Sequence, residues 1–361
     1  MMSTFSRYVL RVFFAQLALL LISFTALLQV FDLLSNSIDV LNRGEGKFSA
    51  LALYAVLRLP EIVSFLTPFG VLLATLMTLG RLERDNEILA FKAAGAPYNA
   101  VLLSFLPAVL MVGVAHFVLA DQVVPRAINA MVQRDIYVDR SSRDDDEPVF
   151  IQDGRAVVEV TSVGKKGATL KQMRIFERGD NGILVRVLQA AEAHYDTQQR
   201  QWMLADVWTT TIVADHPSES LHNPTMIWKT SLTPAEFSNL IELPQAMTLA
   251  KIWSFATSQD VGVRPTYFYE AWLQKRFALP MSSILMILLA APVAHSLYRR
   301  DRGLAAGMAI GFGLGFLYFI SDGLVMSLGE TGAVPPVVAA WMPILVFASV
   351  GGAWLIRLEG Y

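Results

Sequence analysis

The chain has 361 residues, of which 54% are hydrophobic and only 17% are charged, whereas soluble domains carry about a quarter charged residues. This balance excludes an ordinary soluble protein and indicates a membrane protein with several spans and one polar portion. The formal net charge of -2 excludes nothing by itself, and the absence of cysteine excludes disulfides and thiolate metal sites.

Apolar stretches long enough to cross a bilayer occur at both ends of the chain. A helix needs roughly 20 apolar residues to cross the hydrocarbon layer. The first stretch is uncharged and is not followed by a small-residue cleavage site, so we interpret it as a retained span rather than a signal peptide. The six predicted spans are Val12–Phe31, Ile62–Gly80 (extended back through Leu51–Leu59), Tyr98–Ala120, Phe277–Tyr298, Leu304–Ser321 and Val334–Ile356. Pro60, Pro107, Pro280 and Pro292 are expected to kink them.

The basic residues near the span ends predict the orientation, because cytoplasmic loops are enriched in Lys and Arg. If six spans alternate, one side carries Arg7, Arg11, Arg81, Arg84, Lys92, Arg299, Arg300, Arg302 and Arg357. The opposite short loops carry only Arg43 and Lys47. Both termini are therefore predicted to be cytoplasmic.

The segment from Asp121 to about Tyr269 is predicted to lie outside, and most of it alternates apolar and polar residues. Its runs are PVFIQ, AVVEVTSV, TLKQMRIFE, GILVRVLQA, AEAHYD, QWMLADVWTTTIV and TMIWKTSL, and turn sequences separate most of them. This pattern predicts an antiparallel all-β domain and leaves a sandwich and a barrel open. The predicted organisation is spans in 1–120, a β domain in 121–268 and spans in 269–361.

The short cytoplasmic segment RLERDNEILAFKAAGA, Arg81 to Ala96, predicts a small helix between the second and third spans. Asp85 or Asn86 can cap its start and Gly95 can end it in the left-handed conformation. Such a short helix is not stable alone in water, so something must cover its apolar residues. It either folds back on its own bundle or the lipid interface, or it docks on a cytosolic partner.

The chain resembles the lipopolysaccharide export permeases, the F- and G-type membrane subunits of a lipid exporter. The most specific part is the block LPEIVSFLTPFGVLLATLMTLGRLERDNEILAFKAAG at Leu59–Gly95, and the resemblance covers nearly the whole chain. The G-type is favoured by WKTSLTP at Trp228–Pro234, by FISDG around Asp322 and by VPP at Val334–Pro336.

The resemblance implies a six-span α-helical fold with an inserted periplasmic, jelly-roll-like β domain. It also implies that the helix at 85–95 couples to a cytoplasmic ATP-binding-cassette ATPase dimer, through Glu87, Ile88, Leu89 and Phe91. The other implied partners are an F-type permease subunit, a single-span subunit with a periplasmic jelly roll, and lipopolysaccharide. ATP is expected on the ATPase, so no cofactor is expected here.

Two further sets of residues are candidates for function. Gly307, Gly311 and Gly315 continue a stripe that begins at Gly303 and allow a close approach by a neighbouring helix, either within the chain or at a gate facing the partner subunit. Asp322 lies near the outer end of the same span, where a solvated helix end explains a carboxylate as easily as function does. The bases Arg43, Lys47, Arg58 and Arg134 are candidate contacts for lipid phosphates, with ordinary solvated loop charges as the alternative.

Recognisable catalytic chemistry is missing from the sequence. GEGK at Gly44–Lys47 lacks the rest of a phosphate-binding loop, and the histidines have no metal-ligand spacing. We therefore expect no enzyme activity, no metal and no nucleic-acid partner. The leading hypothesis is a permease subunit that extracts lipopolysaccharide and passes it to a periplasmic bridge. The alternatives are the F-type subunit and an adaptor that transmits motion but transports nothing.

Overall fold

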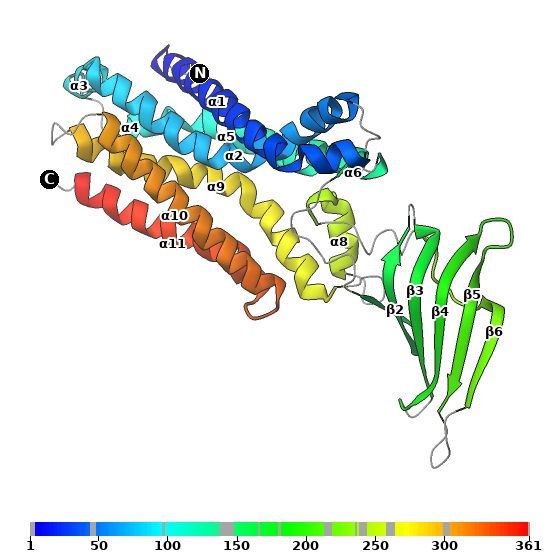
Figure 1. Cartoon of the computed structure of the whole chain (residues 1–361). Coiled ribbons are helices and arrows are strands. Elements are labelled where there is room, and N and C mark those ends of the chain that lie inside the picture. The colour runs from blue at the N-terminus through cyan, green and yellow to red at the C-terminus, as the bar shows by residue number, and fades with distance from the viewer. Residues whose placement is uncertain are drawn as a thin grey trace. The chain divides into compact units, whose positions relative to one another are not determined.

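The computed structural model describes residues 4–43, 48–95, 98–134, 136–137, 148–164, 167–179, 182–212, 219–234, 237, 244–257, 264–298 and 304–359. The chain divides into two compact units (Figure 1). A helical unit comprises 1–138, 245–256 and 267–361, and a β unit comprises 139–244 and 257–266.

The helical unit contains the six predicted spans, each long and apolar enough to cross a membrane. Its helices are α1 (Thr4–Arg43), α2 (Phe48–Arg84), α3 (Glu87–Ala93), α4 (Tyr98–Leu103), α5 (Leu106–Val118), a π-helical segment (Leu119–Val123), α6 (Val124–Gln133), α8 (Leu249–Thr257), α9 (Thr266–Tyr298), α10 (Leu304–Glu330) and α11 (Pro336–Glu359). A 3₁₀ turn, Pro244–Ala246, precedes α8. The prediction of six spans is confirmed, and the structure extends most of them by a turn or more beyond the apolar core.

The third span is divided, as Pro107 suggested. A turn at Ser104 and Phe105 separates α4 from α5, and Pro107 lies in the first turn of α5, where its missing N–H costs nothing. The π-helical segment then leads into α6, so helix continues to Gln133. The predicted domain boundary at 120 thus falls inside a continuous helical segment.

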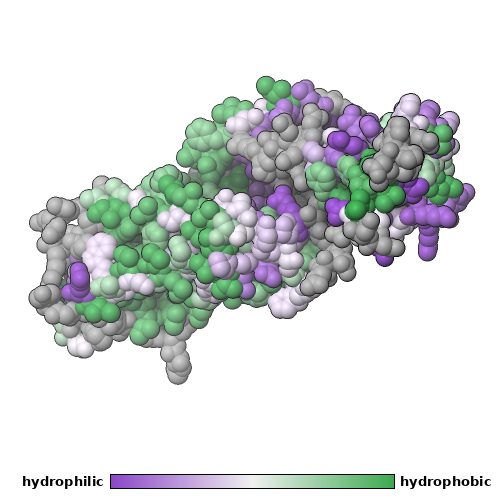
Figure 2. All heavy atoms as spheres, turned by 90° about the horizontal axis from the view of Figure 1, so that it is seen from below, coloured by the Kyte–Doolittle hydropathy of each residue, from purple (hydrophilic) through white to green (hydrophobic). Residues whose placement is uncertain are grey.

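The second span forms the centre of the helical unit. In the most apolar window of α2, 78% of the residues are buried, against 17% in those of α1 and α10. Leu72, Leu73 and Leu79 of α2 are fully buried in the main core. Apolar residues cover much of the surface of the helical unit, whereas hydrophilic residues gather on the β unit (Figure 2). An apolar surface of this kind suits contact with lipid chains.

In the part of the β unit that the structure describes, six strands form one antiparallel sheet in sequence order. The strands are β1 (Val149–Asp153), β2 (Ala156–Val163), β3 (Thr169–Arg178), β4 (Leu184–Asp196), β5 (Gln201–Thr211) and β6 (Glu219–Trp228). The all-β prediction is confirmed. Two details differ from the predicted runs: LVRVLQA and AEAHYD form the single strand β4, and β6 begins before TMIW and ends at Trp228.

A row of residues without ladder partners crosses the sheet. Facing residues are not paired at four places: 161 with 172, 172 with 191, 191 with 206, and 206 with 224. Two of these residues, Gln172 and Asp206, adopt positive φ angles of 50° and 54°. The buried positions change parity at this row in β3, β4 and β5, for example from Leu204 to Val207 in β5. The pairing register is the same on both sides of the row, so one residue of each strand leaves the ladder there without an offset between neighbouring strands.

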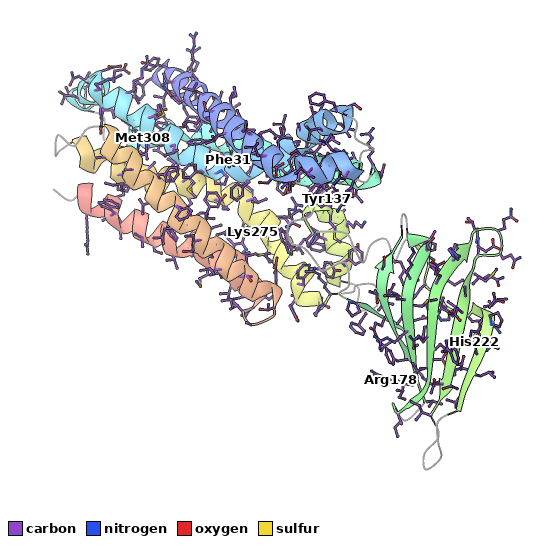
Figure 3. All side chains as sticks on the ribbon, in the orientation of Figure 1. Phe31, Tyr137, Arg178, His222, Lys275 and Met308 are labelled. Carbon is purple, nitrogen blue, oxygen red and sulfur yellow. The ribbon has the colours of Figure 1, made fainter. Side chains whose placement is uncertain are left out.

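The core of the β unit lies on one face of the sheet. Trp202 is 1% exposed, and its ring contacts Trp228 and Phe237 with centroid distances of 6.3 and 5.2 Å. The indole Nε1 of Trp202 donates to the carbonyl of Leu232 at 2.8 Å, so the segment that follows β6 is fastened over this face. His222 on β6 and Arg178 on β3 are labelled in Figure 3.

Candidate functional site: the α3 helix and the polar clusters of the helical unit

The α3 helix forms where the sequence predicted it and is seven residues long. Asn86 directly precedes it with a φ of 58°, and the carbonyl of Asn86 accepts the Ala90 N–H at 3.0 Å. Gly95 follows with a φ of +87°, the left-handed conformation that a glycine adopts without strain. Glu87 lies in the first turn, where the helix dipole favours a carboxylate.

One face of α3 packs on its own bundle and another stays open. Ile88 is 5% exposed and belongs to the main core, and the ring of Phe91 stacks on Phe5 of α1 with centroids 4.5 Å apart. Leu89 is 59% exposed. Of the four predicted coupling residues, two thus hold the helix in place, while Leu89 and the half-buried Glu87 remain accessible.

The side chain of Glu87 is hydrogen-bonded to a residue of α1. The hydroxyl of Tyr8 donates to Glu87 Oε1 at 2.9 Å. The sequence analysis did not single out Tyr8 or Phe5. Nothing local marks these two among the aromatic residues of the first span, because their partners lie about 80 positions further along the chain.

The four predicted phosphate contacts have different surroundings. Arg43 at the end of α1 is exposed and donates from Nη1 to the Tyr137 carbonyl at 3.1 Å. Arg134, directly after α6, is also exposed. Lys47 lies outside the described residues. Arg58 is part of a polar cluster inside the helical unit, described next.

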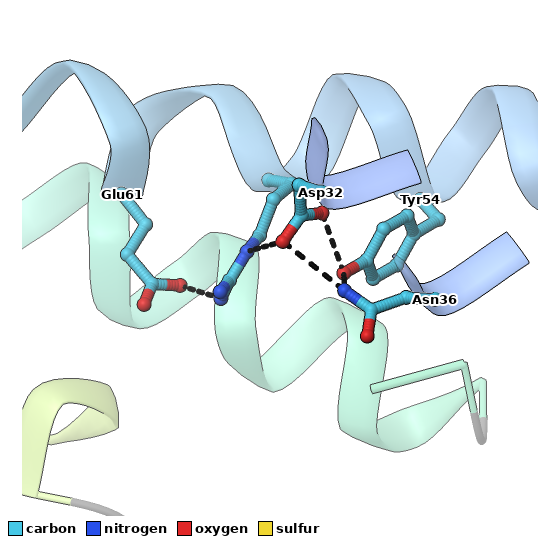
Figure 4. A network of polar contacts seen from close by, with 5 residues as sticks. Asp32, Asn36, Tyr54 and Glu61 are labelled. Atoms are coloured by element: carbon cyan, nitrogen blue, oxygen red, sulfur yellow. Dashed lines mark hydrogen bonds and ion pairs between the residues drawn. The ribbon is translucent and has the colours of Figure 1, made fainter. Parts of the chain in front are cut away.

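The polar cluster joins α1 to α2 through Asp32 (Figure 4). Asp32 is buried, and its Oδ2 accepts the Tyr54 hydroxyl at 2.8 Å, while its Oδ1 accepts the Asn36 amide at 3.1 Å. The Nε of Arg58 lies 3.5 Å from Oδ1 of Asp32, and Nη1 of Arg58 donates to Glu61. A lipid phosphate at Arg58 would therefore have to compete with two carboxylates of the same chain.

The glycine stripe of α10 faces α2. A Cβ at Gly311 would lie 2.1 Å from a terminal methyl of Leu76, and a Cβ at Gly315 would lie 2.8 Å from the Phe69 ring. Gly307 is buried on the same helix. At Gly311 and Gly315 the stripe therefore serves packing within the chain, which is the first of the two alternatives given above.

Asp322, a candidate functional residue in the sequence analysis, has a partner that the sequence analysis did not identify. Lys275 of α9 (labelled in Figure 3) forms an ion pair with Asp322, and the two side chains are only 17% and 16% exposed. A lysine and a carboxylate buried in a membrane protein are stabilised by such pairing. The pair joins α9 to α10.

A second buried arginine fastens the segments that flank the inserted strands. Arg276 of α9 is 5% exposed and donates to the carbonyls of Ala120 and Met247, the latter at 3.0 Å. Asp121 in the π-helical segment accepts the Leu249 N–H at 2.5 Å and so caps the start of α8. Within the described residues no group of three or more His, Asp or Glu residues is arranged to hold a metal.

The six spans, the inserted antiparallel sheet and the short helix between spans two and three are the arrangement that the resemblance implied. The family model of the lipopolysaccharide export system permease LptF/LptG matches residues 7–357. The chain belongs to this family. It is accordingly a multi-pass inner-membrane protein and a permease component of a lipopolysaccharide exporter.

Relatives in the same family span nearly the same length. The lipopolysaccharide export system permease protein LptG of Escherichia coli (strain K12) is 23% identical over 350 residues, which cover 93% of this chain and 92% of the relative. The protein of the same name from Haemophilus influenzae is 22% identical over 317 residues, covering 84% of this chain and 85% of the relative. The similarity thus includes both sets of spans and the strands between them.

Proposed function

We propose that this chain is the G-type permease subunit of the exporter and that α3 docks on a cytoplasmic ATPase dimer. The observation that carries the proposal is the state of α3. Ile88 and Phe91 fix this helix on the bundle, while Leu89 stays 59% exposed and Glu87 half-exposed beside it. An exposed apolar side chain next to a carboxylate suits a partner groove that is apolar inside and basic at its rim.

The proposed orientation in the membrane rests on the distribution of Lys and Arg near the span ends and on the alternation of the six spans. With six spans, the start of α1, the α3 helix, the connection between α9 and α10 and the end of α11 fall on one side of the membrane. This side carries most of the Lys and Arg residues near the span ends, which supports a cytoplasmic location for both termini and for α3. The β unit is then periplasmic.

The remaining partners follow from family membership and from the relatives' names. Both relatives are called LptG, which favours the G-type over the F-type for this chain. The proposed assembly contains an F-type permease subunit, two ATPase copies, and a single-span subunit with a periplasmic jelly roll that receives the lipid. ATP binds to the ATPase, so this chain carries no cofactor and no catalytic residue.

The proposed lipid path runs beside the outer half of α1. Arg43 and Arg134 are exposed bases near the outer ends of α1 and α6, and an arginine can bind a phosphate through two parallel hydrogen bonds. Next to them, α1 exposes large apolar side chains, among them Leu34 and Ile38 at 72% each. Basic groups above an apolar face match a lipid with phosphates on its head group.

Charge reversal at Glu87 tests the docking proposal. Glu87→Arg places a like charge opposite the expected basic rim, so we expect the ATPase to be lost when the complex is purified in detergent. Truncating one side of a buried interfacial charge pair costs about 2–5 kcal/mol, and less at a wet rim. Asp39→Arg, the same reversal at an exposed carboxylate near the other end of α1, serves as the control. Full ATPase recovery with Glu87→Arg would contradict the proposed role of Glu87.

A photocrosslinker separates transport from an adaptor function. Placed at Arg43 or at Ala26, which is exposed on α1, the probe should capture lipopolysaccharide in membranes with the complete exporter. Capture of protein alone at both positions would favour the adaptor alternative and would contradict a lipid path along α1.

A further inference from the structure

The start of α1 holds α3 through two contacts on matching faces. Phe5 and Tyr8 are three positions apart on α1, and their partners Phe91 and Glu87 are four positions apart on α3. Residues with these spacings share one face of a helix. One aromatic stack and one hydrogen bond to a carboxylate therefore join the two helices along about one turn of each.

These contacts matter because α3 has little support of its own. A seven-residue helix is too short to persist alone, and a two-residue turn at Asp85 and Asn86 connects it to α2. Phe91 is one of the residues that pack α3 on the bundle, and its aromatic partner is on α1. The Tyr8 hydroxyl restricts the carboxylate of Glu87, which keeps a second oxygen for another donor.

The α1 helix, which carries Phe5 and Tyr8, lacks the residues at which helices usually bend. The α1 helix runs for 40 residues and contains neither proline nor glycine, the residues at which helices usually kink. Every other span contains at least one of them, for example Pro60 and Pro68 in α2. At 1.5 Å per residue α1 is about 60 Å long. A displacement at its cytoplasmic end is therefore transmitted to its outer end without a natural point of bending.

We propose that Phe5 and Tyr8 make α1 and α3 move as one body, so that force applied to α3 reaches the outer end of α1. Tyr8 is a positioning residue: it holds Glu87 ready for a cationic partner and fastens the docking helix to α1. The inference rests on the proposed function, because it requires an ATPase that acts on α3.

Removal of one hydroxyl tests the role of Tyr8. In the complete complex, Tyr8→Phe keeps the ring and loses the hydrogen bond to Glu87. We expect normal assembly and a drop of about threefold to tenfold in lipid released per ATP hydrolysed, the range for a typical intramolecular hydrogen bond. Tyr267→Phe, at the start of α9, removes a hydroxyl elsewhere and is the control. An equal ratio of lipid to ATP in the two variants would overturn the role of Tyr8.

A cross-link tests the common movement directly. The chain has no cysteine, so Phe5→Cys with Phe91→Cys provides two unique thiols that a short, cleavable bifunctional reagent can join. The unjoined double variant lacks the aromatic stack, so we expect the joined complex to release at least as much lipid as the unjoined one. Loss of release that returns after cleavage would show that the helices must separate, and would overturn the inference. Retained ATPase distinguishes this result from a failure of the proposed docking, in which the ATPase would not co-purify.

Discussion

Alanine at Gly315 should destabilise the helical unit, whereas alanine at Gly313 should not. The added Cβ at Gly315 would lie 2.8 and 2.9 Å from two ring carbons of Phe69 and 3.0 Å from Leu72, while a Cβ at Gly313 meets nothing within 4 Å. Overpacking of this kind costs about 1–3 kcal/mol. Both substitutions gain about 1 kcal/mol of helix propensity, so this gain cancels when the two variants are compared.

The measurement is thermal unfolding of the two purified variants in the same detergent. A difference of about 1–3 kcal/mol corresponds to roughly 2–6 °C in Tm, with Gly313→Ala the more stable variant. Equal Tm values would refute the packing of α10 on α2 at Gly315. If Gly315→Ala then also reduced recovery of the partner permease, the stripe would face that subunit and the gate alternative would regain support.

Three other substitutions follow from the buried contacts. Asp32→Asn should lower the free energy of unfolding by about 1.5–3 kcal/mol, because it removes the charged acceptor of the Tyr54 hydroxyl while Glu61 still pairs with Arg58. An unchanged free energy in chemical unfolding would contradict this role of Asp32. Lys275→Met should lower Tm because it leaves Asp322 unpaired in the membrane. Adding Asp322→Asn should restore Tm, and no restoration would argue against this cause. Trp202→Phe should cost the β unit about 1 kcal/mol, because it removes the bond to Leu232. Unchanged proteolytic protection of the strands would disprove that estimate.

The spans and most of the strand segments could be predicted because both depend on local pattern. Length and apolar content define a span, and the positive φ of Gly95 followed from its place after a short apolar helix. The parity change across the sheet could not be predicted in this way. Strict alternation assumes a regular ladder, and nothing in the individual runs reveals that Gln172 and Asp206 leave it in the same row.

Only part of the candidate site could be predicted, because only part of it depends on local sequence. The location of α3 follows from the segment itself, but the segment does not reveal that Leu89 is exposed while Ile88 is buried. The contact between Tyr8 and Glu87 joins residues 79 positions apart. Arg58 illustrates the same limit of local sequence: as an isolated base it suits a lipid phosphate, yet its neighbours include Asp32 and Glu61. Glu61 lies three residues away on the same helix, whereas only the packing of α1 on α2 reveals Asp32.

The buried contacts of Arg276 have a consequence for how this architecture can change. Arg276 binds the carbonyls of Ala120 and Met247 at once, and Asp121 caps α8. The helix that leads towards the strands and the helix that follows them are thus tied together by groups of the helical unit alone. These contacts close the junction without any group from the strands, so damage to the sheet does not by itself loosen the helices on either side of it.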